Sequence, residues 1–314
     1  MAELIGDLTA SSQRDDKHIY LRFIWQFMTM GQMAIDDFGK AQFMLTGTDL
    51  IADINGCQPG RGRMALWWLG QHSYVVKIAD TILYIDVFFT AMPARLVPPL
   101  LPAELATNAD FICGTHDHAD HIDHPAWPIA AKASPQAKFV VPRAFVQGLA
   151  EEFHLPAERF LGVDDGLSVQ AGPVKITGVP AAHEFLAIDP KTGGNLFLGF
   201  VFEADGLCFY HAGDTCMYEG MQAKLRRWKF DLMLLPINGR DAKRLSSGCI
   251  GNLTFQEAAD LAGSLRPQLV IPAHYDMFAI NSANPQDFLD YYRVKYPSLH
   301  AATCEYGQRM ILPQ

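Results

Sequence analysis

One stretch decides the fold: Thr115-His116-Asp117-His118-Ala119-Asp120-His121-Ile122-Asp123-His124, which holds four of the chain's 11 histidines. It directly follows an apolar run at 109–114 that is typical of a buried strand, so the histidines occupy the loop at that strand's carboxyl end. In extended backbone, side chains two positions apart point to one side, so His116 and His118 can bind one ion. After a turn, Asp120 and His121 can face a second ion. Imidazole and carboxylate are ligands that Zn²⁺ and Mn²⁺ accept, which disfavours a merely solvated loop.

Composition places this loop in an ordinary globular protein. The chain has 314 residues, of which 49% are hydrophobic and 19% charged, enough for one large α/β domain or two smaller ones. Its 25 basic and 34 acidic residues leave a net charge of −9. No global basic field therefore attracts nucleic acid or an anionic membrane, and we expect neither as a partner. A small anionic substrate would need local cations or metals.

The cysteines and the first residues indicate a cellular compartment. Six cysteines are scattered without a C-x-x-C pair, and they are typical of buried small residues in a reducing environment. No signal peptide is visible at the N-terminus. The longest apolar segment, 23–35, is interrupted by polar residues and too short to span a bilayer. We expect a soluble, cytoplasmic protein.

Two regions differ in texture. Residues 1–62 are predicted to be a helical extension and linker, because large side chains recur at helical spacing over 19–38 and glycines concentrate in 53–63. The extension's Met and aromatic stripe favours packing against the core or a partner subunit, so a homo-oligomer is expected; a lid is the alternative. Residues 63–314 are predicted to be the second region, the domain that contains the histidine loop.

Within that second region, short apolar strands come first as a meander and then alternate with helices. This order predicts a sheet-rich α/β protein with helices outside. Strands are expected at 65–69, 74–78, 81–87, 109–114, 138–141, 174–179, 197–203, 207–210, 231–235 and 269–271, and helices at 143–152, 217–229, 254–266 and 285–296. The third helix opens with Thr254-Phe255-Gln256-Glu257, a capping box.

The histidine loop matches the H-x-H-x-D-H signature of the metallo-β-lactamase superfamily, and three further motifs follow in the expected order. They are Pro180-Ala181-Ala182-His183-Glu184, Tyr210-His211-Ala212-Gly213-Asp214-Thr215 and Ile271-Pro272-Ala273-His274-Tyr275-Asp276. The resemblance covers the chain from about Met64 to its end. It implies an αββα sandwich, an α/β fold whose two sheets carry the site along one edge.

Carried over by this resemblance, the metal ligands fall into two sets around two divalent ions, Zn or Mn. The first set would be His116, His118 and His183; the second would be Asp120, His121 and His274, with Asp214 bridging both. Two ions about 3.5–4 Å apart would activate a shared water and polarise the substrate oxygen. Asp120 would also act as the catalytic residue that orients this water or takes its proton.

Other residues are predicted to surround this centre. Arg240, with Asn238 beside it, could clamp a phosphate or carboxylate, or it could belong to a solvated loop. Tyr218 aligns roughly with a tyrosine of the superfamily's L-ascorbate-6-phosphate lactonase branch and could reach the substrate. His211 and His72 are predicted to support the ligands by hydrogen bonds, with simple burial as the alternative for His211.

The function expected first is hydrolysis of a small phosphorylated or acidic lactone. The run Met64-Ala65-Leu66-Trp67-Trp68-Leu69-Gly70 and the histidine loop resemble the L-ascorbate-6-phosphate lactonase branch, whereas His183 is a feature that phosphodiesterases of the superfamily keep. A phosphodiesterase acting on a cyclic nucleotide or phospholipid-derived ester is therefore the alternative. A di-iron oxygen reductase is disfavoured because His118 stands where those proteins resemble H-x-E-x-D, and an RNA-processing nuclease is disfavoured by the net charge.

Overall fold

The computed structural model describes residues 33–35 and 41–313, which divide into two units, 1–45 and 46–314. In the first unit, β1 (Met33–Ile35) pairs antiparallel with β2 (Ala41–Phe43). Most of the predicted N-terminal helix, 19–38, lies outside the described residues, and the three residues of β1 are a strand instead. No described helix is both long and apolar enough to cross a bilayer.

The second unit contains two large sheets. The first has the order β17-β3-β4-β5-β6-β7-β8, in which β5 to β8 run parallel. Its strands are β3 (Met64–Gly70), β4 (Ser73–Ile78), β5 (Thr81–Ile85), β6 (Phe111–Cys113), β7 (Lys138–Pro142), β8 (Phe160–Val163) and β17 (Arg309–Leu312). The expected meander is β3-β4-β5, and every residue of these three strands is buried.

The second sheet has the order β16-β15-β14-β13-β10-β9. Its strands are β9 (Ser168–Ala171), β10 (Val174–Pro180), β13 (Leu198–Ala204), β14 (Leu207–His211), β15 (Leu232–Pro236) and β16 (Leu269–Ala273). A short hairpin of β11 (Ala182–His183) and β12 (Phe185–Leu186) leaves this sheet after β10. Because β14, β15 and β16 are parallel, the loops after them emerge at one edge.

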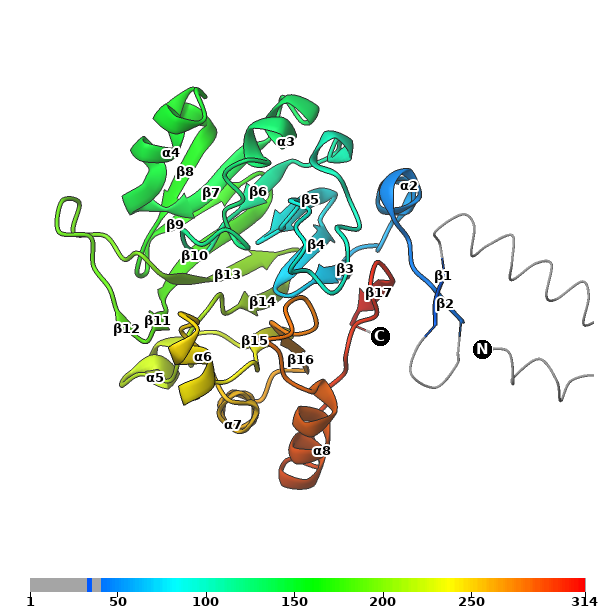
Figure 1. The fold of residues 1–314 in the computed structure, drawn as a ribbon, viewed down its shortest axis with the longest axis vertical. Helices are drawn as coiled ribbons and strands as arrows, with labels where there is room; N and C mark the ends of the chain where they lie inside the picture. The colour runs from blue at the N-terminus through cyan, green and yellow to red at the C-terminus, as the bar shows by residue number, and fades with distance from the viewer. Residues whose placement is uncertain (1–32, 36–40, 314) are drawn as a thin grey trace, which may run out of the picture. The chain divides into compact units, whose positions relative to one another are not determined.

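Helices lie outside the two sheets, with α3 and α4 beside the first sheet and α5 to α8 beside the second (Figure 1). They are α3 (Trp127–Ala133), α4 (Val146–Glu152), α5 (Met221–Leu225), α6 (Ala242–Ser246), α7 (Phe255–Leu265) and α8 (Pro285–Lys295), with short 3₁₀ turns at Ala103–Leu105, Arg143–Phe145 and Ala157–Arg159. The predicted capping box of α7 is confirmed, since Thr254 and Glu257 bond reciprocally. The predicted αββα sandwich is confirmed.

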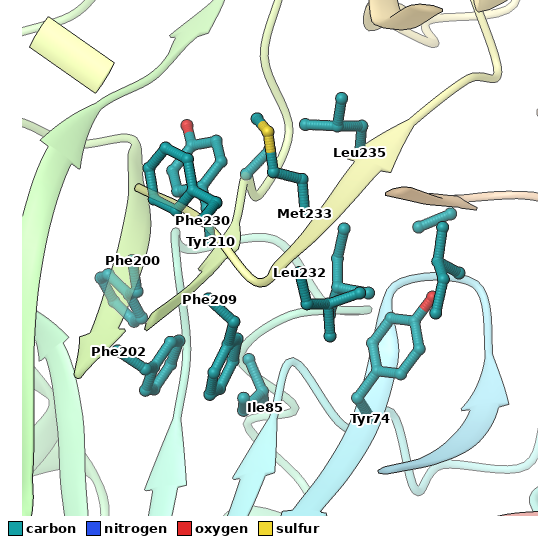
Figure 2. Close-up of a cluster of buried hydrophobic side chains, with 14 of the residues drawn as sticks. Tyr74, Ile85, Phe200, Phe202, Phe209, Tyr210, Phe230, Leu232, Met233 and Leu235 are labelled. Carbon is teal, nitrogen blue, oxygen red and sulfur yellow. The ribbon is translucent and has the colours of Figure 1, made fainter. Parts of the chain in front are cut away.

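The core lies between the sheets (Figure 2). Tyr74 and Ile85 from the first sheet and Phe202 and Phe209 from the second are all fully buried. The rings of Phe202 and Phe209 stack with centroids 4.4 Å apart. This apolar layer places both sheets in one rigid body, so loops from each can be held against the other.

The predicted linker is the main departure from the sequence reading. Residues 47–56 form helix α2 (Gly47–Gly56), and the second unit, which begins at Thr46, includes this helix. Leu50 and Ile54 are fully buried, and the buried Lys77 amine donates to the carbonyls of Ile54 and Asn55 at the helix end. Those carbonyls have no partner within the helix, so Lys77 stabilises its C-terminus.

Candidate metal centre

The predicted ligands come from four loops that meet where strands end. The histidine loop follows β6, the hairpin carrying His183 follows β10, Asp214 follows β14, and His274 follows β16. Strands β10 and β14 are both antiparallel to β13, so they point the same way and their carboxyl ends share an edge. The sheet topology therefore gathers side chains from across 116–274 at one site.

The first cluster consists of His116, His118 and His183, whose ligand atoms all lie within 4.8 Å of one another. His116 Nε2 and His118 Nδ1 are 3.0 Å apart. Burial lowers the pKa of all three imidazoles, and that of His183 falls to about 4. The rings are therefore neutral at pH 7, which is the form that binds a metal.

The second cluster consists of Asp120, His121 and His274, with the same mutual limit of 4.8 Å. The Asp120 carboxylate lies 3.6 Å from His121 Nε2 and 3.8 Å from His274 Nε2. Two nitrogens and an oxygen thus converge beside the first cluster. The rings of His116 and His121 link the two clusters, with centroids 4.0 Å apart.

Asp214 is buried beside the second cluster. Its oxygens lie 3.4 Å from His121 Nε2 and 3.1 Å from His274 Nε2. Burial opposes its ionisation, but His274 and His121 lower the pKa of Asp214 well below its ordinary value. The glycine before it is required, because Gly213 has φ +59° and a Cβ there would lie 2.6 Å from the Leu198 carbonyl oxygen. The bridge from Asp214 to the first cluster stays a prediction.

Unpaired buried atoms test whether these residues suit a cation. Within the described part of the chain, His121 Nε2, His183 Nδ1, His274 Nδ1 and Asp214 Oδ1 are buried without a hydrogen-bond partner. Burial opposes a charge on His121, but three carboxylates raise its pKa to about 10: those of Asp214, Asp120 and Asp86. Buried polar atoms are normally paired, so such a group with excess negative charge fits a divalent ion.

Asp86 is a part of the site that the sequence reading missed. It follows β5, is fully buried, and accepts hydrogen bonds from His121 Nδ1 at 2.6 Å and from the Thr115 hydroxyl at 2.7 Å. The Nδ1–H bond leaves His121 Nε2 free to face the cluster. The sequence carried a signal, because Asp86 is an acidic residue near the end of the short apolar strand predicted at 81–87.

Strained backbone marks the same surroundings. Positive φ angles occur at Gln71 (54°), Asp86 (49°) and His274 (62°), none of which is glycine. The fully buried Gln71 side-chain nitrogen lies 3.2 Å from Asp120 Oδ2 and 3.3 Å from His274 Nε2. Residues held in this sparsely populated region cost about 1–3 kcal/mol each and cluster at functional sites. Gln71 is thus a second group that sequence reasoning missed.

The predicted supports His72 and His211 are fully buried and stack on each other, with ring centroids 4.0 Å apart. His211 Nε2 donates to the His72 carbonyl at 2.9 Å, and its Nδ1 accepts from the Gly213 amide at 3.3 Å. His72 Nδ1 is 3.8 Å from Asp214, and His72, His121 and Asp214 meet the same 4.8 Å limit as the two clusters. His72 is therefore close enough to His121 and Asp214 to be one of the groups that could hold an ion.

The three predicted substrate-contacting side chains already have protein partners. Arg240 forms two 2.7 Å bonds with the Glu257 carboxylate, so a substrate anion would compete with Glu257. Asn238 bonds through both ends of its amide, to Asn281 and Asn252. The Tyr218 hydroxyl donates to the Pro180 carbonyl at 2.6 Å. Their roles toward substrate stay predictions.

A different cation, Arg95, lies within electrostatic reach of Asp120 and Asp123 of the histidine loop. Its guanidinium donates to the carbonyls of Phe88, Thr90 and Val97, and burial lowers its pKa to about 10. Thr90 in turn is held by Asp123, two residues after His121. Among the described carboxylates, none lies within ion-pair distance of Arg95. Asp123 and Asp120 act on its charge from beyond that distance.

The centre opens to solvent on one side. His118 is exposed and the Asp120 side chain is 21% exposed, whereas the remaining ligands are buried. Of the residues in the two clusters, His118 and Asp120 are therefore the ones that solvent reaches most.

Comparisons with known proteins agree with this geometry. A family model described as a β-lactamase superfamily domain matches residues 81–275. A UPF0173 metal-dependent hydrolase of Thermococcus onnurineus is 33% identical over 222 residues, covering 70% of this chain and 88% of the relative. Another from Caldivirga maquilingensis is 28% identical over 248 residues, covering 79% and 98%. The solved metallo hydrolase Igni18 of Ignicoccus hospitalis superposes with a TM-score of 0.64 at 22% identity, covering 80% and 99%, which supports the fold.

Proposed function

Because the chain belongs to the metallo-β-lactamase superfamily, within the UPF0173 family of metal-dependent hydrolases, we propose that it opens a small phosphorylated or acidic lactone. The observation that carries this proposal is the pair of adjacent ligand clusters at one solvent-open edge. Divalent ions in such clusters activate water and polarise a carbonyl or phosphoryl oxygen.

The protein's own groups would position the reaction. Asp120 is the partly exposed carboxylate at the mouth, so it can orient an incoming water and accept its proton. Gln71 donates to Asp120 and thereby limits the directions its oxygens can take. Asp86 holds the proton of His121 at Nδ1, which keeps Nε2 directed at the centre.

A second candidate function is hydrolysis of a small phosphodiester. The observation that favours it is His183, which joins His116 and His118 in the first cluster. In the resemblance described above, this histidine is a feature of phosphodiesterases of the superfamily. The same water activation serves both reactions, so the substrate's reacting atom, carbon or phosphorus, separates them.

An acidic substrate would need a cation near the mouth. Arg240 was predicted for this role, but its guanidinium pairs with Glu257, whereas Arg95 has no such carboxylate. We expect Arg95→Ala to raise KM for an anionic lactone more than Arg240→Ala does. For a neutral lactone measured in parallel, the two variants should raise KM equally little. If Arg95→Ala raised KM equally for the anionic and the neutral lactone, Arg95 would have no role in binding the acidic group.

The proposal is tested by metal analysis followed by a substrate screen. Elemental analysis of protein purified without added metal or a histidine tag should find about two equivalents of Zn or Mn per chain. The loaded protein is then assayed with sugar-acid lactones, phosphorylated lactones and cyclic nucleotides. Turnover of lactones supports the proposal, turnover of cyclic nucleotides alone supports the alternative, and no hydrolysis at any metal loading contradicts both.

A further inference from the structure

A cavity of about 430 Å³ lies where the ligand loops continue past the metal centre. Two of its lining residues, Glu184 and Cys216, directly follow the ligand His183 and the Asp214-Thr215 pair. The Cys216 amide donates to the Ala182 carbonyl at 2.7 Å and thus holds the two ligand loops together. The cavity is of the size that proteins use to bind small molecules.

The charges that line this cavity are mostly neutralised by protein partners. Arg240 pairs with Glu257, and Asp241 pairs with Arg244 while also capping helix α6. Glu184 is exposed and has no ion-pair partner among the described residues. The cavity therefore offers no unpaired cation among these side chains, and its one unpaired charge would repel an anion.

What remains on the wall is apolar. Met217, Leu245, Cys249 and Ile250 line the cavity together with Cys216. Leu245 is 64% exposed and Ile250 is 37% exposed, so both present aliphatic surface to solvent. Covering that surface with an apolar group would stabilise a complex by about 25 cal/mol per Å² removed from water.

We propose that this cavity binds the uncharged apolar arm of the substrate while the hydrolysed group lies at the metal centre. The inference rests on the proposed hydrolysis and deepens it, since it adds a substrate class: lactones or esters that carry an alkyl or acyl chain. The acidic group of such a substrate then lies on the other side, away from Glu184. Chain length, rather than charge, becomes what the cavity selects.

The first test measures KM of the metal-loaded enzyme for γ-lactones with successively longer alkyl tails. In the wild type, KM should fall by up to about fourfold per added methylene until the cavity is filled. Leu245→Asp and Ile250→Asp should flatten this dependence. The matched control is Val294→Asp on α8, where the side chain is 84% exposed and outside the cavity lining, and it should keep the wild-type slope. A flat wild-type series, or equal slopes in all variants, overturns the proposal.

The second test does not depend on hydrolysis. Octan-1-ol should slow alkylation of Cys249, which lines the cavity, and leave that of Cys208 unchanged, because Cys208 is a part-buried thiol of β14 outside it. Peptide mapping after timed labelling reads both sites in one sample. Selective protection with no lactone turnover would keep the cavity proposal and reject the proposed function. Lactone turnover without protection of Cys249 would reject the cavity proposal alone.

Discussion

The two halves of the candidate metal centre are built differently. The first cluster contains only histidines, one of which, His118, is exposed. The second cluster mixes Asp120 with two buried histidines, and Asp86 and Gln71 brace it from behind. Buried, hydrogen-bonded ligands lose little freedom when a metal binds, whereas an exposed one must be ordered. We therefore expect the second cluster to be preorganised and the first to adapt to the substrate.

This contrast explains why negative charge concentrates in one half. Three carboxylates surround His121, and Asp214 is held between His121 and His274. The neutral first cluster has none among its own members. The half with the carboxylates attracts a cation more strongly, and the neutral half leaves room for a substrate oxygen.

The largest expected effect comes from Asp214, because it is predicted to serve both halves. Asp214→Ala should lower bound metal by at least one equivalent and reduce hydrolysis by about 10⁴-fold or more, the upper end for one acid–base group. Elemental analysis and steady-state kinetics measure the two effects. Asp290→Ala, an exposed carboxylate on α8, should change neither. Full metal content in Asp214→Ala would refute the shared role.

A substitution of Asp120 should distinguish the catalytic role of the second cluster from metal binding by the first. Asp120→Asn keeps the shape of the side chain but removes its charge, so kcat should fall by about 10²–10⁴-fold while metal in the first cluster is retained. The measurement is kcat alongside metal content of the same preparation. A wild-type rate would show that Asp120 neither orients water nor accepts its proton.

The brace on His121 should have an intermediate effect. Asp86→Asn weakens the hydrogen bond to Nδ1, so metal affinity of the second cluster should fall by about 10–100-fold. Competition with a fluorescent chelator measures this affinity, and excess metal should restore part of the activity. Asp164→Asn is the matched control. Asp164 is also a buried carboxylate that accepts hydrogen bonds, but its partners are Asn195 and Arg143, which belong to neither cluster. Unchanged affinity in Asp86→Asn would mean that the two halves are equally braced.

The smallest effect concerns the exposed side of the first cluster. Burial opposes protonation of His124, but hydrogen bonds to Asp117 and Glu152 raise its pKa above the ordinary value of 6.5. This contribution to stability is complete below pH 6.5 and is lost as the pH rises through the raised pKa. Because the pair is partly exposed, we expect less than about 1 kcal/mol. Thermal unfolding of wild type and His124→Gln across this range should converge at high pH, and parallel curves would contradict the assignment.

Much of the fold could be predicted from the sequence because its strands are short, apolar and separated by turns. The meander 64–85 and the strands preceding each ligand loop lie within a few residues of their predicted positions. Helix α2 was missed because its glycines at both ends, Gly47 and Gly56, are typical of a linker. Strands β8, β9 and β17 were also missed, since each is only four residues long and its burial does not alternate.

The side chains that cluster at the centre could be predicted, and so could His72 and His211 beside them, but Asp86 and Gln71 could not. His116, His118, Asp120 and His121 lie within six residues, so their spacing alone indicates a metal site. Asp86 supports His121 only because β5 and β6 are neighbours in the sheet, which no local pattern encodes. Arg240 looked free in the sequence because its partner, Glu257, lies 17 residues further along the chain, on helix α7.

By itself, the sequence determined which residues are metal-ligand types and that they follow short apolar strands. Spacing and hydrophobic periodicity are local properties, so they can be read without knowing the fold. Only the tertiary structure decided which of these residues share a cluster and which side chains brace them. It also decided that His118 and Asp120 face solvent. Those properties depend on strand order and register, which bring residues far apart in the chain to the same edge.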